Sequence, residues 1–237
     1  MWSGPRFLST ALLRSWGSRA DTATADEPFY GYFLAATGAE RPGREDSLSL
    51  MPHNWETVVR WLEGPIPDSK VIWYQKHHAL HLVGDLPWEW MDQVTNCFLI
   101  RNPRLVIPSY SRIRPEFSAA DLGYEQLFEV FDYVRRGSGI PLVLDASDLR
   151  RSPKLYLEAL CSAVGVSFDP AMLSWEAGRR PTDPSPCDPW YRRVQQTTDF
   201  VGGPDVFPDV KQQYRAILET CSEFYDRLFQ HRLRVPE

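Results

Sequence analysis

The sequence predicts a three-layer α/β fold, in which a mainly parallel central sheet is flanked by helices. Strand-like and helix-like patterns alternate along most of the chain, which is typical of a parallel sheet with covering helices. The chain has 237 residues, of which 43% are hydrophobic and 24% are charged. That is enough to bury the core of one large α/β domain and too little for two. We therefore expect a single domain over residues 1–237.

Two helices and a strand are predicted in the first quarter of the chain. Apolar residues at helical spacing predict a short helix over residues 10–16, and residues 22–25 have the pattern of a short strand. Asn54 is a suitable N-cap for a second helix, which runs to about residue 62 and which Gly64 would end.

Three further strands and a helix are predicted between residues 70 and 146. The stretches 70–76, 96–101 and 141–146 are rich in apolar and β-branched residues, as buried strands are. Apolar side chains recur at helical spacing over 124–134, and Gly137 is the expected end of that helix.

The last third of the chain predicts two helices separated by a long loop. Ser152 followed by Pro153 is a helix start, with a capping residue and a proline in the first helical position. Residues 208–232 carry one apolar helical face and predict a C-terminal helix. Residues 174–208 are rich in Pro, Gly, Arg and Trp with little periodicity, so we expect an ordered loop that acts as a lid or binds substrate.

The composition excludes several classes of protein. A net charge of −5 argues against a nonspecific nucleic-acid binder, so any anion site must be local and built from a few arginines. No apolar run approaches the roughly 18 residues of a membrane span. The four cysteines show no metal-binding or disulfide spacing, and they are expected to be small core residues in a reducing compartment, which predicts a cytoplasmic protein.

The N-terminal stretch "SGPRFLSTALLRSW" places a small-residue turn directly before a helix. Free backbone N–H groups at the helix start, the hydroxyls of Ser9 and Thr10 and the guanidinium of Arg6 together make a cradle for an anion. Two alternatives are an ordinary capped helix and an organellar transit peptide, because the first 19 residues are rich in Arg and Ser and lack acids.

The stretch "FLIRNPRLVIPS" has a second polar group at the end of a strand. The strand ends at Arg101, whose side chain extends over the sheet edge, and Pro103 starts the next helix. Ser109 lies about two turns further along, so its hydroxyl can return to the same anion. The alternative is a solvated arginine and an ordinary helix serine.

Together these two segments resemble the superfamily of sulfotransferases that use 3′-phosphoadenosine-5′-phosphosulfate (PAPS), which has a P-loop-type fold. Pro5 to Thr10 is similar to that superfamily's 5′-phosphosulfate loop, and Arg101 to Ser109 to its 3′-phosphate motif, RxPRxxxxS. A sulfotransferase-like branch found in bacteria and in some fused plant proteins resembles the chain further. The stretches that carry this likeness are "DEPFY", "WYQKHHALHL", "DASDL", "FDPAMLSWEAGRRPTD" and "PWY". None of these motifs specifies the acceptor.

The resemblance implies which residues bind PAPS, the expected co-substrate. The 5′-phosphosulfate loop would comprise Gly4, Pro5, Arg6, Phe7, Leu8, Ser9 and Thr10. Arg101 and Ser109 would hold the 3′-phosphate, and Arg179 and Arg180 would close over the nucleotide. Arg6 would neutralise charge on the bridging oxygen, where many relatives use lysine.

Two departures bear on this expectation. Phe7 and Leu8 replace the small residues of the commoner loop, so we expect the backbone to cup the phosphosulfate differently. Only three residues precede the turn, so the central strand is expected to be truncated or the start codon misplaced.

The acceptor hydroxyl needs a base. Cytosolic sulfotransferases carry KTHLP after the corresponding strand, and Lys76 and His78 align with its lysine and histidine. The alternative base is Glu27, which itself could be only a charge at a helix start. His77 and His81, four residues apart, could share a helix face or bind a metal; we expect no metal.

Three functional hypotheses follow. The first is a PAPS-dependent sulfotransferase that moves a sulfuryl group in line to a hydroxyl or amine of a small-molecule acceptor. The second is a P-loop kinase or NTPase in which Asp145 binds magnesium, although the loop lacks the required lysine. The third is a non-catalytic nucleotide-binding protein that kept the fold.

Overall fold

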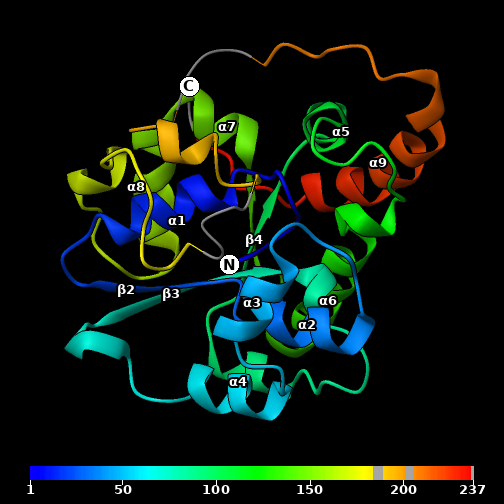
Figure 1. Ribbon diagram of the computed structural model, residues 1–237. Helices are drawn as coiled ribbons and strands as arrows, with labels where there is room; N and C mark the ends of the chain where they lie inside the picture. The colour runs from blue at the N-terminus through cyan, green and yellow to red at the C-terminus, as the bar shows by residue number, and fades with distance from the viewer. Residues whose placement is uncertain (184–188, 201–204, 236–237) are drawn as a thin grey trace.

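The computed structural model describes residues 1–183, 189–200 and 205–235. Its centre is one sheet of five parallel strands in the order β2-β3-β1-β4-β5 (Figure 1). The strands are β1 (Trp2–Ser3), β2 (Thr22–Asp26), β3 (Ile72–His78), β4 (Cys97–Ile100) and β5 (Leu142–Asp145). The predicted α/β class and parallel sheet are confirmed.

The central strand is very short. Trp2 and Ser3 pair with His77 and His78 of β3 on one side, and Trp2 pairs with Phe98 of β4 on the other. β1 therefore keeps its place between two neighbours with only two residues. Because all five strands are parallel, the segments that leave β1, β3 and β4 start at one edge of the sheet.

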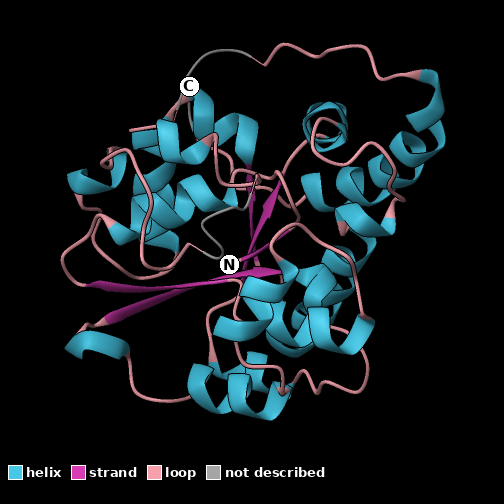
Figure 2. Cartoon of the chain, in the orientation of Figure 1, coloured by secondary structure: helices cyan, strands magenta, loops and turns pink. Residues whose placement is uncertain are grey.

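Nine α-helices lie within the described residues. They are α1 (Ser9–Gly17), α2 (Tyr30–Thr37), α3 (Arg44–Leu50), α4 (Trp55–Leu62), α5 (Pro103–Ser111), α6 (Tyr124–Ser138), α7 (Ala146–Arg151), α8 (Pro153–Ala163) and α9 (Arg215–Phe229). Figure 2 shows them gathered on both sides of the strands. No helix in the described part of the chain is long and apolar enough to cross a membrane.

Alternating strand residues divide the core into two layers. Phe98 and Ile100 of β4 pack with α4, α5, α6 and α9, whereas Leu99 between them packs with α1, α7 and α8. The same alternation separates Val143 from Leu144 in β5. Successive side chains of a strand point to opposite faces of the sheet, so each face packs against its own layer of helices. The predicted three-layer arrangement is confirmed.

Several predicted boundaries need correction. Gly137 lies inside α6, and the helix ends one residue before Gly139, whose φ of 86° suits a glycine. The C-terminal helix starts at Arg215 and not at residue 208, because residues 205–211 are irregular. Helices α2 and α3 were not predicted. In α2 the apolar residues do not gather on one side of the helix, so the sequence shows no amphipathic pattern there.

The cysteines of the described residues behave as predicted. Cys97, Cys161 and Cys221 are free and buried. The fourth, Cys187, lies outside the described residues, as does the rest of 184–188 and all of 201–204 within the predicted lid segment.

The turn between β1 and α1 depends on a close backbone approach at Gly4. A Cβ atom at this position would lie 2.5 Å from the carbonyl oxygen of Leu122 and 2.8 Å from the ring of Phe7. Two further residues of the turn, Arg6 and Leu8, adopt left-handed conformations with φ of 69° and 77°. The turn is therefore constrained both by close packing at Gly4 and by the left-handed backbone of Arg6 and Leu8.

We expect Gly4→Ala to destabilise the protein by about 1–3 kcal/mol, because backbone must move to accept the methyl group. Gly17→Ala is the matched control at the other end of α1, where a Cβ atom would meet only ordinary contact at 3.4 Å. Urea unfolding of the two variants measures the difference. Equal stability of both variants would contradict the assignment of a close approach at Gly4.

Candidate functional site

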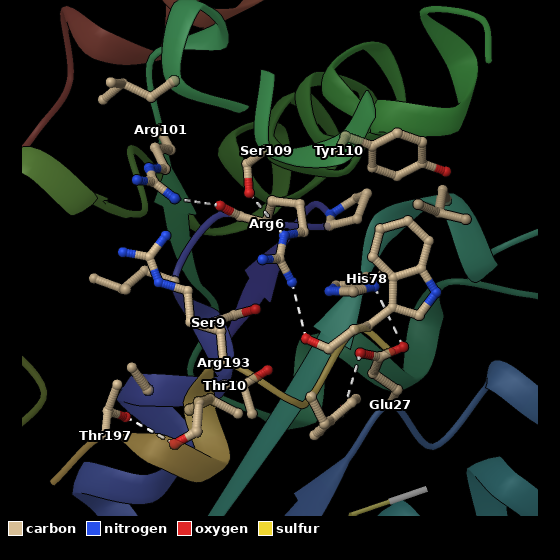
Figure 3. Close-up of a pocket in the computed structure, with 18 of the residues that line it drawn as sticks. Arg6, Ser9, Thr10, Glu27, His78, Arg101, Ser109, Tyr110, Arg193 and Thr197 are labelled. Carbon is tan, nitrogen blue, oxygen red and sulfur yellow. Dashed lines mark hydrogen bonds and ion pairs between the residues drawn. The ribbon is translucent and has the colours of Figure 1, made fainter. Parts of the chain in front are cut away.

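A cavity of about 380 Å³ opens at the carboxyl edge of the sheet, between the β1–α1 turn, the ends of β3 and β4, and residues 190–199 and 205–206 (Figure 3). Of the residues expected from the sequence to form the site, Pro5, Arg6, Leu8, Ser9, Thr10, Glu27, His78, Arg101 and Ser109 line it.

The N-terminus of α1 faces this cavity with unpaired donors. Its N-cap, Leu8, has no side chain that can accept a hydrogen bond, and no side-chain cap is present. The backbone N–H groups of Ser9, Thr10 and Ala11 are therefore without partners inside the helix. These three residues line the cavity, so the positive end of the helix dipole points toward it. This is the geometry of an anion cradle.

The two motifs predicted to bind one ligand are in direct contact. The Nε of Arg6 donates to the hydroxyl of Ser109 at 3.0 Å, and Nη1 of Arg101 donates to the backbone carbonyl of Arg6 at 2.8 Å (Figure 3). Arg6 also donates to the carbonyl oxygen of Trp190 at 2.9 Å. The turn, the end of β4 and helix α5 thus form one wall of the cavity.

Two arginines that the sequence analysis missed also line the cavity. Arg150, in α7 after β5, and Arg193, in the segment that crosses the opening, lie near Arg101. Burial, followed by the positive charge of Arg150, lowers the pKa of Arg101 from its ordinary value. Arg150 is itself paired with Asp205, which also lines the cavity. The other guanidinium groups near Arg101 still favour an anion at this wall. The only sequence signal for Arg150 was its place after a strand.

Arg179 and Arg180, expected to cover the nucleotide, do not line the cavity. Arg180 donates instead to the carbonyl oxygen of Glu176 at 2.9 Å, and Arg179 is exposed. The residue of this stretch that is held in place is Asp183, whose buried carboxylate pairs with Arg14 of α1 at 2.7 Å. That ion pair fixes residue 183 against α1.

Phe7 and Gly4 contribute to the packing of the turn and do not line the cavity. The ring of Phe7 is fully buried and packs on Tyr124, with 4.7 Å between ring centroids. The bulky residue at this position therefore points away from the cradle into the core. Its side chain leaves the backbone N–H groups of α1 open to the cavity.

Lys76 is buried in a cluster of charged groups at the end of β3. Its Nζ lies 2.7 Å from a carboxylate oxygen of Asp26 and 2.7 Å from Oε1 of Glu27. The hydroxyl of Tyr191 donates to Asp26 at 2.8 Å, which ties the segment over the cavity to β2. Lys76 is only 1% exposed and does not line the cavity. It therefore holds Glu27 in place from behind the cavity surface.

Ionic contacts set the protonation of this cluster. Burial would lower the pKa of Lys76, but the two carboxylates outweigh burial and raise it. Burial raises the pKa of Asp26 to about 6 despite the neighbouring ammonium. Burial would also raise the pKa of Glu27, but His78, Lys76 and His81 hold it below its ordinary value.

His78 and Glu27, the two alternative bases, lie side by side. Nδ1 of His78 is 3.3 Å from Oε2 of Glu27 (Figure 3). Burial lowers the pKa of His78 to about 4 although the carboxylate opposes it, so the imidazole is neutral at pH 7. Lys76 is then the main group that keeps Glu27 ionised. A neutral imidazole that donates Nδ1–H to the carboxylate has a free lone pair on Nε2.

The cavity beyond His78 has a mixed lining. Tyr30, Leu80, Tyr110 and Trp190 present apolar and aromatic surface. Arg41 also lies here, but it forms an ion pair with Asp121 at 2.8 Å. His81 completes this end and lies with Nε2 3.9 Å from Oε2 of Glu27. His77, in contrast, points to the other side of the strand and stacks on Trp2.

Asp145, the expected magnesium ligand of a kinase, has a structural role. Its carboxylate accepts backbone hydrogen bonds from Ser147 and Asp148 and caps α7, and Tyr225 donates to it at 3.0 Å. The residue is 1% exposed and does not line the cavity. Its carboxylate oxygens therefore accept hydrogen bonds that stabilise the fold.

The buried lysine predicts a stability effect that can be measured. Lys76→Met leaves two carboxylates without their cation, and we expect a loss of about 3–5 kcal/mol in the free energy of unfolding. Lys154→Met, which breaks a solvated pair with Glu158 on α8, is the matched control and should change little. Similar losses in the two variants, measured by urea unfolding at pH 7, would contradict the buried cluster.

Comparisons with known proteins place this arrangement in a family. Two curated proteins of Arabidopsis thaliana, branched-chain-amino-acid aminotransferase-like proteins 1 and 2, are 36% and 34% identical over 232 residues. The match covers 97% of this chain, which spans 41% of the length of each relative. The solved sulfotransferase domain from the Synechococcus PCC 7002 olefin synthase superposes with a TM-score of 0.54 at 18% identity. It covers 93% of this chain and 92% of that domain, which supports the same fold.

The family model that matches the sequence is described as a sulfotransferase domain. The match runs over residues 1–231 and so includes the β1–α1 turn, the end of β3 and the β4–α5 motif. The chain therefore belongs to the sulfotransferase domain family.

Proposed function

We propose that this chain transfers a sulfuryl group from PAPS to a hydroxyl, or an amine, of a small-molecule acceptor. The observation that carries the proposal is the contact between the two anion motifs. Arg101 and Ser109 both bond to Arg6, so the α1 cradle and the end of β4 form one continuous surface. A nucleotide with phosphate groups at both its 5′ and 3′ positions matches two anion sites on one wall.

The charges of this wall support a multiply charged anion. Arg6, Arg101, Arg150 and Arg193 all line the cavity, together with the N-terminus of α1, and one of them, Arg150, is paired with Asp205. In the proposed complex the N–H groups and hydroxyls of Ser9 and Thr10 bind the 5′-phosphosulfate. Arg101 and Ser109 bind the 3′-phosphate, and Arg6 neutralises the charge that grows on the bridging oxygen.

His78 and Glu27 supply the proton transfer in this proposal. The acceptor oxygen forms a bond to sulfur while the bond from sulfur to the 5′-phosphate oxygen breaks. The hydroxyl proton passes to Nε2 of His78, and 3′,5′-bisphosphoadenosine leaves. Glu27, whose Oε2 lies 3.3 Å from Nδ1, stabilises the imidazolium that forms. The two candidate bases thus have different roles, one accepting the proton and the other orienting the ring.

Two alternatives make different predictions about binding. A kinase needs a magnesium ligand, but Asp145 caps α7 and does not reach the cavity. A non-catalytic nucleotide-binding protein was suggested by Phe7 and Leu8, but Phe7 packs into the core. Binding of 3′,5′-bisphosphoadenosine without transfer to any hydroxyl compound would favour this second alternative.

We expect 3′,5′-bisphosphoadenosine to raise the melting temperature, whereas ATP with magnesium leaves it unchanged. A ligand at a hundred times its dissociation constant adds about 2.7 kcal/mol to the stability, which thermal unfolding detects easily. Arg101→Ala should weaken binding of the bisphosphate by about 10- to 100-fold, because a charge-assisted contact is lost. Binding of adenosine-5′-phosphosulfate, which has no 3′-phosphate, should change much less.

Arg112→Ala is the matched control for this experiment. Arg112 is exposed, lies at the C-terminal end of α5 and does not line the cavity. Titration calorimetry of the wild type and the two variants with both nucleotides measures six dissociation constants. Equal losses for the two nucleotides in Arg101→Ala would refute the assignment to the 3′-phosphate, and stabilisation by ATP with magnesium alone would favour a kinase.

Transfer assays distinguish the roles of His78 and Glu27. We expect His78→Gln to lower kcat by about 10²- to 10⁴-fold, the contribution of a general base, with bisphosphate affinity nearly unchanged. Glu27→Gln should lower kcat less, since the base remains. His53→Gln, at an exposed position, is the control. Production of bisphosphate is measured with PAPS and a panel of hydroxyl acceptors, and a larger loss in Glu27→Gln would identify the carboxylate as the base.

A further inference from the structure

We propose that Glu27, His78 and His81 form a binding site for a divalent transition metal ion, best suited to Zn²⁺. The site lies at the acceptor end of the same cavity. Its consequence for sulfuryl transfer rests on the function proposed above, whereas the binding itself does not. This departs from the expectation of no metal, which considered only the pair His77 and His81.

The three ligand atoms are close to the spacing that zinc requires. Oε2 of Glu27 lies 3.3 Å from Nδ1 of His78 and 3.9 Å from Nε2 of His81, and all three atoms lie within 4.8 Å of one another. A tetrahedral ion with bonds of about 2.0–2.1 Å spaces its ligand atoms by roughly 3.3 Å. One of the three contacts already has this spacing. Small ring rotations of the histidines would bring the other two to it.

The donor set has the chemistry of a zinc or cobalt site. Two imidazole nitrogens and one carboxylate oxygen make three protein ligands, and the cavity leaves the fourth position open.

His81 gives an independent indication. The residue is 3% exposed, and its Nδ1 atom is buried with no hydrogen-bond partner among the described residues. Its Nε2 atom is too far from Glu27 for a hydrogen bond at 3.9 Å. A metal at Nε2 would give this buried ring its polar contact on the side that faces Glu27. Its ring is held by aromatic contacts with Tyr30 and Phe33, at 5.2 and 5.0 Å between centroids.

The surroundings orient the carboxylate and balance the charge. Lys76 binds Oε1 of Glu27 and so leaves Oε2 for the metal. Lys76 pairs with Asp26 as well as with Glu27, and Asp121 pairs with both Arg41 and Arg114. The Oε2 atom of Glu27 faces the two histidines.

The metal and the acceptor proton compete for one imidazole. When Zn²⁺ binds Nδ1 of His78, the neutral ring carries its proton on Nε2. The lone pair that would accept the hydroxyl proton is then gone. Zinc should therefore inhibit sulfuryl transfer even when PAPS is bound.

The binding test uses the untagged full chain after chelator treatment. Co²⁺ is the probe, because a four-coordinate ion gives intense visible absorption bands, and Zn²⁺ is then measured by competition. We expect one ion per chain. His81→Phe keeps an aromatic ring beside Tyr30 and Phe33, and it should weaken binding by at least about 100-fold, more than loss of an outer-shell partner does. His53→Phe, at an exposed histidine outside the cluster, should bind like the wild type.

His78→Phe provides a second binding variant should His81→Phe fail to fold. Absence of the cobalt bands, unchanged affinity in both cluster variants, or loss of binding in His53→Phe would each overturn the site. Inhibition is measured as the ratio of transfer rates with and without Zn²⁺, and His81→Phe should lose it. If cobalt binds with the expected variant pattern but 3′,5′-bisphosphoadenosine does not bind, the metal site stands and the proposed function fails.

Discussion

The site depends on the contact between Arg101 and the backbone carbonyl of Arg6. This hydrogen bond of 2.8 Å joins the end of β4 to the turn after β1, two segments 95 residues apart in sequence. The side chain of Arg6 returns the contact by donating to Ser109 of α5. The tight turn, with its two left-handed residues, is therefore held by hydrogen bonds from β4 and α5 as well as by its own packing. The same contacts keep several positive groups at one wall, where burial and mutual repulsion favour an anion.

A second buried network lies on the opposite side of the cavity. Lys76 holds Asp26 and Glu27 together at the ends of β2 and β3, and Tyr191 connects them to the segment that crosses the opening. Such a cluster is costly to desolvate and stable only when each charge has its partner. It determines which oxygen of Glu27 faces the cavity. The lysine therefore affects chemistry at the site without touching a ligand.

The neighbourhood of Glu27 supports two different states of His78. With Nδ1–H donated to the carboxylate, the ring can accept a proton at Nε2, as the proposed sulfuryl transfer requires. With a metal at Nδ1, the proton lies on Nε2 and the ring cannot act as a base. His81 belongs to the second state only. One pair of side chains can thus supply a base or a metal ligand, depending on what occupies the space between them.

The sequence by itself determined the order of the strands along the chain and the position of the two candidate anion motifs. Hydrophobic periods, caps and strand-ending polar residues such as Arg101 are local signals, and they do not depend on distant contacts. Only the tertiary structure decided which side chains meet. It turned Phe7 into the core, directed Arg180 away from the cavity and brought Arg150 and His81 into it. Those outcomes depend on strand order and on long-range packing, which join residues from separate segments and leave no periodic trace in the chain.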